Sequence, residues 1–395
     1  MYGKLLLFLT TLVTYVVLFE LIARIFFPLP SPYHLEEARL IKYQRGFWLN
    51  QPNQFQQFSN GVDFNNAEFR TDGAGLRNVP CRRQGDKNAP IIYVIGDSQT
   101  LGWGLSDQET WVNQFQCLMV EKNIAYNVIN MGVPGTNIDQ YIVRTKMIHG
   151  NLRKQDLVIY VITWNDFHTK QNAIDIKKNI ISNLDNTQSC VTKDFEKGEI
   201  NYPVFCPPPK YKFYNQKTNW RRNLYEATGL LIPSFSSAKE FVDTVVYSSV
   251  AANIFVPVAK DLFIKYQDSD TLQKIEPDTF ESNNNLIRFA NKIVRQKTDN
   301  VMFMFLPNRI SYVTNLYELY SKGGKVFPDQ DFLWHFAKKS CEKNALNCLS
   351  LFPSLITDRI GVHEFAHDGH LNETGSRKVA LAIFNYISTK FPMNK

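Results

Sequence analysis

The sequence lacks any long run of lysine or arginine, although its formal net charge is +7 over 395 residues. Basic residues scattered singly act as solvated surface charge, which argues against a dedicated nucleic-acid-binding protein. Paired Cys-x-x-Cys motifs and the Cys/His spacing of a zinc site are also missing. With 44% hydrophobic and 21% charged residues, the composition is that of a globular protein, long enough for a large core or for a core with an inserted lobe.

The six cysteines are an even number and are spread widely along the chain. If the protein is exported to an oxidising compartment, two pairs could close short loops and the remaining two residues could form a third pair. These pairs are Cys190 with Cys206, Cys341 with Cys348, and Cys81 with Cys117. The alternative is six reduced, partly buried thiols, and the sequence leaves both open.

An apolar run from Leu5 to Phe27 is interrupted only by Glu20 and Arg24. As a helix it is long enough to span the hydrocarbon core of a bilayer. A cleaved signal peptide is the competing interpretation, but the run is long for one and no small-residue cleavage site precedes Pro28. Residues 1–30 are therefore predicted to be an uncleaved signal anchor that crosses the cell membrane once.

After this anchor, residues 31–90 are polar and aromatic and are predicted to be a leader that packs on the folded domain. It contains Phe69-Arg70 and Gly75-Leu76-Arg77, and we expect a hairpin that covers a sheet edge. The basic residues before the anchor are few, but they favour a folded domain on the periplasmic, extracytoplasmic side.

From Ile91 onward, short buried runs alternate with helical periodicity. Strands are predicted at residues 91–95, 126–130, 157–163, 301–306 and 348–352, and helices at residues 111–122, 138–149, 286–297, 331–344 and 376–389. This alternation predicts an α/β protein, a three-layer α/β/α sandwich around a doubly wound parallel sheet of flavodoxin-like type. Residues 170–285 do not continue the rhythm and contain a helical pattern at residues 238–266. They are predicted to be an inserted, mostly helical lobe between two halves of the core, residues 91–169 and 286–395.

The turn after the first predicted strand carries a serine. Ile91–Ile95 is followed by Gly96, and Asp97-Ser98-Gln99-Thr100 has side chains suited to a helix N-cap. Ser98 would then lie at the carboxyl edge of the sheet, where ligands of such folds bind. A helix N-terminus there supplies backbone N–H groups and partial positive charge for a developing oxyanion.

Four segments in this order resemble the four motif blocks of the SGNH (GDSL-type) hydrolase family. They are Gly96-Asp97-Ser98, Asn130-Met131-Gly132-Val133-Pro134-Gly135-Thr136, Thr163-Trp164-Asn165-Asp166 and Asp368-Gly369-His370-Leu371-Asn372. Each motif alone is weak, but four in this order, at places where strands are expected to end, make a strong joint signal. The resemblance covers the core and leaves the lobe of residues 170–285 without a counterpart.

The resemblance implies a serine nucleophile, Ser98, with His370 as its base and Asp368 as the acid that orients the base. It also implies an oxyanion hole formed by the backbone N–H groups of Ser98 and Gly135 and by the side-chain amide of Asn165. No Gly-x-Ser-x-Gly surrounds Ser98, which argues against the nucleophile elbow of α/β-hydrolases.

Some assignments have alternatives. In this family the acid usually lies three residues before the histidine, a position that His367 occupies here, so Asp368 is assigned and Glu364 is kept in reserve. Gly132 is the alternative to Gly135, which could be a turn glycine only.

Two further positions depart from the family pattern, because Thr163 stands where glycine is usual and Gln99 where leucine is common. The cluster of His363, His367 and His370 also invites a metal-site interpretation. It lacks the helical histidine spacing of a zinc protease, so no metal and no cofactor are predicted.

The function implied is a membrane-anchored serine esterase that removes acetyl or other acyl groups from an envelope or extracellular glycan. One alternative is an O-acyltransferase that uses the same residues and replaces water with a sugar hydroxyl. Another is a non-catalytic glycan-binding protein with this fold. The expected partners are the acylated glycan and the membrane, with no nucleic acid, and the oligomeric state is left open.

Overall fold

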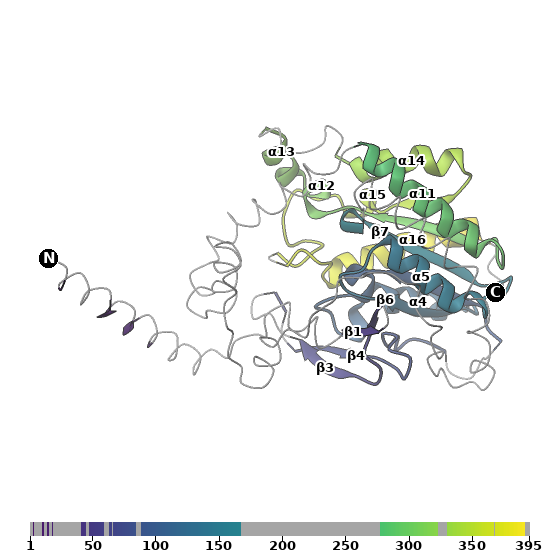
Figure 1. Cartoon of the computed structure of the whole chain (residues 1–395), viewed down its shortest axis with the longest axis horizontal. Helices are drawn as coiled ribbons and strands as arrows, with labels where there is room; N and C mark the ends of the chain where they lie inside the picture. The colour runs from purple at the N-terminus through teal and green to yellow at the C-terminus, as the bar shows by residue number, and fades with distance from the viewer. Residues whose placement is uncertain are drawn as a thin grey trace. The chain divides into compact units, whose positions relative to one another are not determined.

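A computed structural model describes eight segments of the chain together with a few isolated positions among its first 18 residues (Figure 1). The segments are residues 41–44, 47–58, 63–64, 66–83, 88–166, 277–322, 330–366 and 368–391. The chain divides into two compact units. One is Met1–Glu36 with Lys212–Asp268, which lies almost wholly outside the described residues, and the other is Glu37–Tyr211 with Ser269–Lys395.

A five-stranded parallel sheet forms the centre of the second unit. Its strands are β5 (Ile91–Gly96), β6 (Asn127–Gly132), β7 (Leu157–Thr163), β8 (Val301–Leu306) and β9 (Asn347–Ser350). They are hydrogen-bonded in the order β6-β5-β7-β8-β9. Counted along the chain this is the order 2-1-3-4-5, that of flavodoxin-like doubly wound sheets, so the predicted sheet is confirmed.

Helices cover both faces of this sheet and bury two separate cores. On one face, Tyr93 and Ile95 pack with side chains of α5 (Ile138–His149), α11 (Pro277–Val294) and α14 (Phe332–Lys343). On the other, the alternate strand residues pack with α4 (Trp111–Glu121) and α16 (Glu373–Lys390). Figure 1 shows α5 and α11 side by side, as their contacts require. Because β5, β7 and β8 are covered on both faces, they are apolar along almost their whole length.

Most element boundaries agree with the pattern of the sequence to within three residues, and two of the differences have a physical reason. Helix α11 begins at Pro277, nine residues before the predicted start, because proline is well tolerated in the first turn of a helix. Strand β9 ends at Ser350, and Phe352–Leu355 forms the short helix α15 with Pro353 in its first turn. The other short elements are α3 (Ser98–Leu101), η1 (Asp107–Glu109), η2 (Trp164–Asp166), α12 (Arg309–Tyr312) and α13 (Thr314–Lys322).

Two disulfides are present in the described part of the chain. They join Cys81 to Cys117 and Cys341 to Cys348, as the first of the two interpretations predicts. The predicted pair of Cys190 and Cys206 lies outside the described residues.

The predicted anchor (residues 1–30) and inserted lobe (residues 170–285) fall mostly on residues that the structure does not describe. Within the residues it does describe, none of the helices has the length and apolar character needed to cross a membrane.

The leader forms two antiparallel hairpins. Strand β1 (Ile41–Gln44) pairs with β2 (Phe47–Asn50), and β3 (Phe55–Phe58) pairs with β4 (Ala67–Arg70). Beyond β4, Arg77 makes an antiparallel bridge to Asn130 of the edge strand β6. The leader thus contacts the open edge of the parallel sheet at the strand that precedes one of the motif loops.

Arg77 is the most heavily bonded residue of this contact and is only 2% exposed. Its guanidinium donates to the carbonyl oxygens of Leu101 (2.8 Å), Gly102 (2.7 Å) and Leu105, and to Asp107 Oδ1 at 3.2 Å. Burial lowers the pKa of Arg77 to about 10, although Asp107 partly offsets this. The guanidinium therefore stays charged and ties the leader to the segment that follows the Ser98 turn.

Replacement of Arg77 by methionine is expected to lower the free energy of unfolding by about 3–5 kcal/mol, because the buried Asp107 would lose its fully buried cationic partner and keep only the more exposed guanidinium of Arg70 at 3.5 Å. Denaturant unfolding measures the change as a lower midpoint. Arg82→Met is the matched control, since Arg82 is exposed on the same segment and its loss should change stability by no more than about 0.5 kcal/mol. Equal effects of the two substitutions would contradict the role given to Arg77.

Candidate active site

The serine lies at the sharp turn between β5 and α3. The Asp97 side chain caps this short helix by accepting the backbone N–H of Gln99 at 2.9 Å, and Gly102 closes it in a left-handed conformation (φ 82°). Gly96 is required before the turn, because a Cβ there would lie 1.9 Å from Thr100 Oγ1. The turn holds Ser98 at the carboxyl edge of the sheet, where it is 7% exposed.

His370 and Asp368 reach this serine from the loop before α16. His370 Nε2 lies 2.7 Å from Ser98 Oγ, and His370 Nδ1 is hydrogen-bonded to Asp368 Oδ1. The Trp103 ring lies beside the imidazole, with ring centroids 6.3 Å apart. The structure therefore brings three residues that the motifs predict for catalysis into one chain of hydrogen bonds.

Asp368 is the carboxyl group that carries charge in this series of hydrogen bonds. Burial alone raises its pKa, but the neighbouring His370 and the hydrogen bonds from it more than compensate, so that the Asp368 pKa is lowered from its ordinary value. An ionised carboxylate on Nδ1 favours the imidazole tautomer that leaves Nε2 able to accept the serine proton.

Glu364, the reserve for the acid, has other partners. It accepts hydrogen bonds from the Tyr312 hydroxyl at 3.1 Å and from the backbone N–H of Gly361 at 3.0 Å. Burial raises the pKa of Glu364, and these hydrogen bonds counter part of that rise. Glu364 thus holds the loop to α12, while His367 lies outside the described residues.

The three predicted oxyanion donors stand at the ends of adjacent strands. Ser98 follows β5, Gly135 follows β6 and Asn165 follows β7. Gly135 is exposed and has φ 65°, a conformation that favours glycine, and among the described residues beyond its two neighbours no atom lies within 4 Å of the place that a Cβ would take. Gly132, the alternative, donates its N–H to Asn130 Oδ1 at 2.9 Å, so that N–H is already used.

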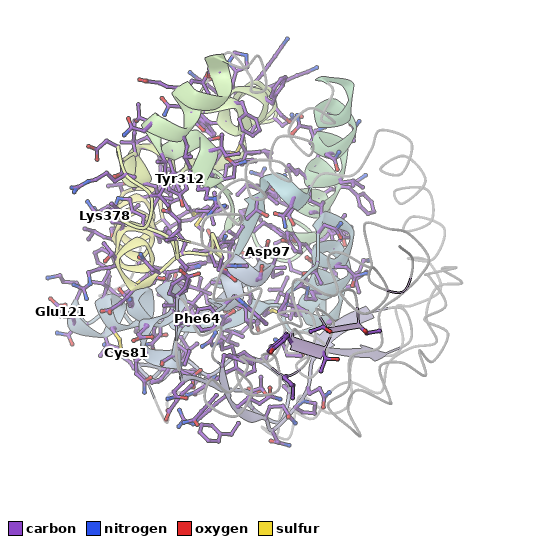
Figure 2. All side chains as sticks on the ribbon, turned by 90° about the vertical axis from the view of Figure 1, so that its left-hand side faces the viewer. Phe64, Cys81, Asp97, Glu121, Tyr312 and Lys378 are labelled. Atoms are coloured by element: carbon purple, nitrogen blue, oxygen red, sulfur yellow. A yellow bond between two sulfur atoms is a disulfide. The ribbon has the colours of Figure 1, made fainter. Side chains whose placement is uncertain are left out.

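Thr163, which replaces the usual glycine, organises a buried polar network under this edge. Its hydroxyl lies 3.1 Å from Asp97 Oδ2 and 3.0 Å from Asp166 Oδ2, and it donates to Asn165 Oδ1. Figure 2 shows Asp97 in the interior, where it is 1% exposed. The Asn165 side chain also hydrogen-bonds to Asp97, which counters part of the rise that burial causes in the Asp97 pKa.

The two carboxyl groups of this network are electrostatically unequal. Burial raises the pKa of Asp97, but His370 counters part of the rise. Burial raises the pKa of Asp166 well above its usual range, and the charge of Asp97 raises it further. Asp166 accepts hydrogen bonds from the Tyr141 hydroxyl and from the backbone N–H of Thr163, both at 2.6 Å, and these bonds counter part of the rise.

A cavity of about 390 Å³ lies beside the loop that bears Asp368 and His370, although neither His370 nor Ser98 is among its lining residues. Phe64 and Phe365, whose ring centroids are 5.1 Å apart, are among its lining residues, as are Asp63, Glu109 and Glu373. Phe64 is labelled below Asp97 in the view of Figure 2. Aromatic faces mixed with hydrogen-bond acceptors suit a ligand that has both ring faces and hydroxyl groups.

A parallel sheet of order 2-1-3-4-5, a serine directly after its first strand and an Asp-x-His loop before its last helix together define the SGNH hydrolase fold. The resemblance read from the four motifs is thereby confirmed at the level of the fold.

Comparison with known proteins adds neighbours of low similarity. No protein-family model matches the chain, and no curated protein matches it in sequence. A lipase/acylhydrolase from Enterococcus faecalis is 11% identical, with 78% of this chain and 99% of that one covered and a TM-score of 0.38. A lipolytic G-D-S-L family protein from Veillonella parvula is 11% identical, with 77% of this chain and 98% of that one covered and a TM-score of 0.36. An acetyl xylan esterase is 13% identical, with 75% of this chain and 99% of that one covered and a TM-score of 0.37. Because these TM-scores are low, the assignment to the SGNH hydrolase fold depends on the strand order and on the site geometry of this chain.

Proposed function

We propose that the protein is a serine esterase that works through a covalent acyl-Ser98 intermediate. The observation that carries this proposal is the 2.7 Å contact between His370 Nε2 and Ser98 Oγ, continued by the contact between His370 Nδ1 and Asp368. A serine hydroxyl is a weak nucleophile until a neighbouring base removes its proton, and this arrangement supplies the base in the required tautomer.

The reaction then has two halves. In the first, His370 takes the Ser98 proton as Oγ attacks the ester carbonyl, and it returns that proton to the departing alcohol when the C–O bond breaks. In the second, His370 takes a proton from water, the resulting hydroxide attacks the acyl-enzyme, and the carboxylic acid leaves as Ser98 regains its proton. The N–H groups of Ser98 and Gly135 and the Asn165 amide stabilise the oxyanion in both halves.

Loss of the Asn165 amide is expected to lower kcat by about 10²- to 10³-fold, the usual effect of removing one oxyanion donor. Asn165→Ala tests this with p-nitrophenyl acetate. Thr163→Ser is the matched control, because it keeps the hydroxyl that accompanies Asn165 Oδ1 and should retain most of the activity. A Thr163→Val variant should fall between the two, and unchanged kcat in Asn165→Ala would remove Asn165 from the proposed hole.

For the substrate we propose acetyl or related acyl esters of an envelope or extracellular glycan. The cavity bordered by Phe64 and Phe365 supports this, because sugar rings stack on aromatic faces and their hydroxyl groups donate to carboxylates such as Glu373. The Leu5–Phe27 run supports a membrane anchor. The two disulfides support a folded domain on the oxidising, extracytoplasmic side.

An acetyl-balance assay tests the function. The full-length chain in detergent is incubated with an O-acetylated polysaccharide, and free acetate and glycan-bound acetyl groups are both measured. An esterase releases acetate as the bound acetyl groups disappear, and the Ser98→Ala variant does neither. Transfer of acetyl groups to an added unacetylated glycan without free acetate would identify an O-acyltransferase instead. Glycan binding with neither reaction would point to a non-catalytic binding protein.

A further inference from the structure

Gln99 stands where the relatives that the motifs resemble commonly have leucine, and its side chain contacts the catalytic loop on both sides of His370. Its Oε1 accepts the backbone N–H of Leu371 at 3.1 Å, and its Nε2 faces the carbonyl oxygen of Gly369 at 3.5 Å. Because a backbone N–H can only donate, the first contact fixes which end of the amide faces Leu371. A leucine side chain would make neither contact.

Gln99 is itself held rigidly. Its backbone N–H donates to Asp97 Oδ1 at 2.9 Å, and its carbonyl oxygen accepts from Trp111 Nε1 at 3.0 Å. Trp111 is 1% exposed in one of the two cores. The residue that directly follows the nucleophile therefore offers a fixed point to which the base can be attached.

A second side chain holds the other end of the same loop. Asp63 Oδ2 accepts the backbone N–H of Asp368 at 2.9 Å, across 305 residues of sequence. Asp63 belongs to the leader, which also contacts the sheet edge through Arg77. The leader thereby contacts Asp368, the proposed acid, directly.

The remaining N–H groups of the loop are used internally. Gly369 donates to the Phe365 carbonyl at 2.9 Å, and His370 donates to Asp368 Oδ1 at 3.2 Å. Of the four successive N–H groups from Asp368 to Leu371, the first and last are therefore held by side chains from other parts of the chain. In this loop the acid lies only two residues before the base, so a small change of backbone geometry alters how the Asp368 and His370 side chains meet.

We propose that Gln99 and Asp63 are positioning residues that hold the loop bearing Asp368 and His370 in register with Ser98. This inference rests on the proposed function, and it adds two residues that the motif resemblance does not include. Reaction rates depend steeply on such placement, since a displacement of about 1 Å can cost about 10²-fold.

The test compares variants that remove each contact with variants that keep it. Gln99→Met keeps the length of the side chain without its hydrogen bonds, and Gln99→Leu introduces the residue common among relatives. Asp63→Leu removes the acceptor, whereas Asp63→Asn retains an oxygen for the Asp368 N–H. For the full-length chain, kcat/KM with p-nitrophenyl acetate and the second-order rate of fluorophosphonate labelling are measured from pH 5 to 9, with thermal unfolding as a check on folding.

Both Gln99 variants and Asp63→Leu are expected to lower kcat/KM and the labelling rate on the order of 10- to 100-fold. Asp63→Asn should retain most of kcat/KM and most of the labelling rate. In the impaired variants the weaker Asp368–His370 contact holds the shared proton less tightly, so the acidic limb of kcat/KM should move to lower pH. A residue that merely supports the fold would change the unfolding temperature and leave this profile in place.

The outcomes separate this inference from the proposed function. A wild-type chain that neither labels nor turns over ester would contradict the function itself. A wild-type chain that labels, beside Gln99→Leu and Asp63→Leu variants that label at the same rate with the same pH profile, would overturn the positioning role alone. If Asp63→Leu fails to fold, Gln99→Leu decides, because leucine at this position is common in folded relatives.

Discussion

Replacing Ser98 with alanine is expected to lower kcat for p-nitrophenyl acetate by roughly 10⁶-fold. Without Oγ, no acyl-enzyme forms, and the oxyanion donors alone give only residual catalysis. Labelling by a fluorophosphonate probe should disappear as well, because the probe bonds to the activated serine oxygen.

The comparison needs variants that differ in one respect only. His370→Ala leaves the serine in place and should also abolish labelling, since Ser98 Oγ loses the base 2.7 Å away. Ser388→Ala is the matched control, an exposed serine of α16 whose hydroxyl bonds to the Phe384 carbonyl. It should label like the wild type. Label that persists in Ser98→Ala would show that another nucleophile reacts.

The parallel sheet was predictable because its strands are buried on both faces. Such strands read as short, continuous apolar runs, and Leu157–Thr163 and Val301–Leu306 were predicted with the boundaries that the structure shows. The end of strand β9, in contrast, was not predicted correctly. Leu351 and Phe352 continue the apolar run of that strand, yet Pro353 favours a first helical turn there. Local backbone preference overrode hydrophobic pattern at that point.

The residues of the proposed site could be picked out for a different reason. Ser98, Asn165, Asp368 and His370 lie within short motifs at the ends of strands or before a helix, so their positions follow from local sequence. The residues that hold them in place do not follow from local sequence. Gln99 meets Leu371 across 272 residues, and such a contact has no signature in the sequence of either segment.

The substitutions that depart from the family pattern were visible in the sequence, but their roles were not. Thr163 and Gln99 both replace residues without a hydrogen-bonding side chain, and in the structure each bonds to a residue of the proposed site or its loop. A polar residue at a position where relatives have an apolar one is therefore a usable signal. Its meaning becomes clear only when the partner is known.

The second large effect concerns the acid. Asp368→Asn is expected to lower kcat by about 10⁴-fold, because an amide opposite His370 Nδ1 no longer selects the tautomer that leaves Nε2 able to accept the serine proton. Steady-state hydrolysis of p-nitrophenyl acetate measures the loss, and the fluorophosphonate labelling rate should fall in parallel because the same base activates Ser98.

Glu364→Gln is the control that decides between the two candidate acids. Glu364 bonds to the Tyr312 hydroxyl and to the Gly361 N–H, and glutamine keeps an oxygen for one of them. We therefore expect less than about a tenfold loss of kcat, with some loss of stability from the partner left unsatisfied. The reverse ranking, with Glu364→Gln nearly inactive and Asp368→Asn active, would mean that the loop rearranges on binding substrate. Near-equal losses would mean that His370 is oriented by the whole loop and that neither carboxylate acts on it alone.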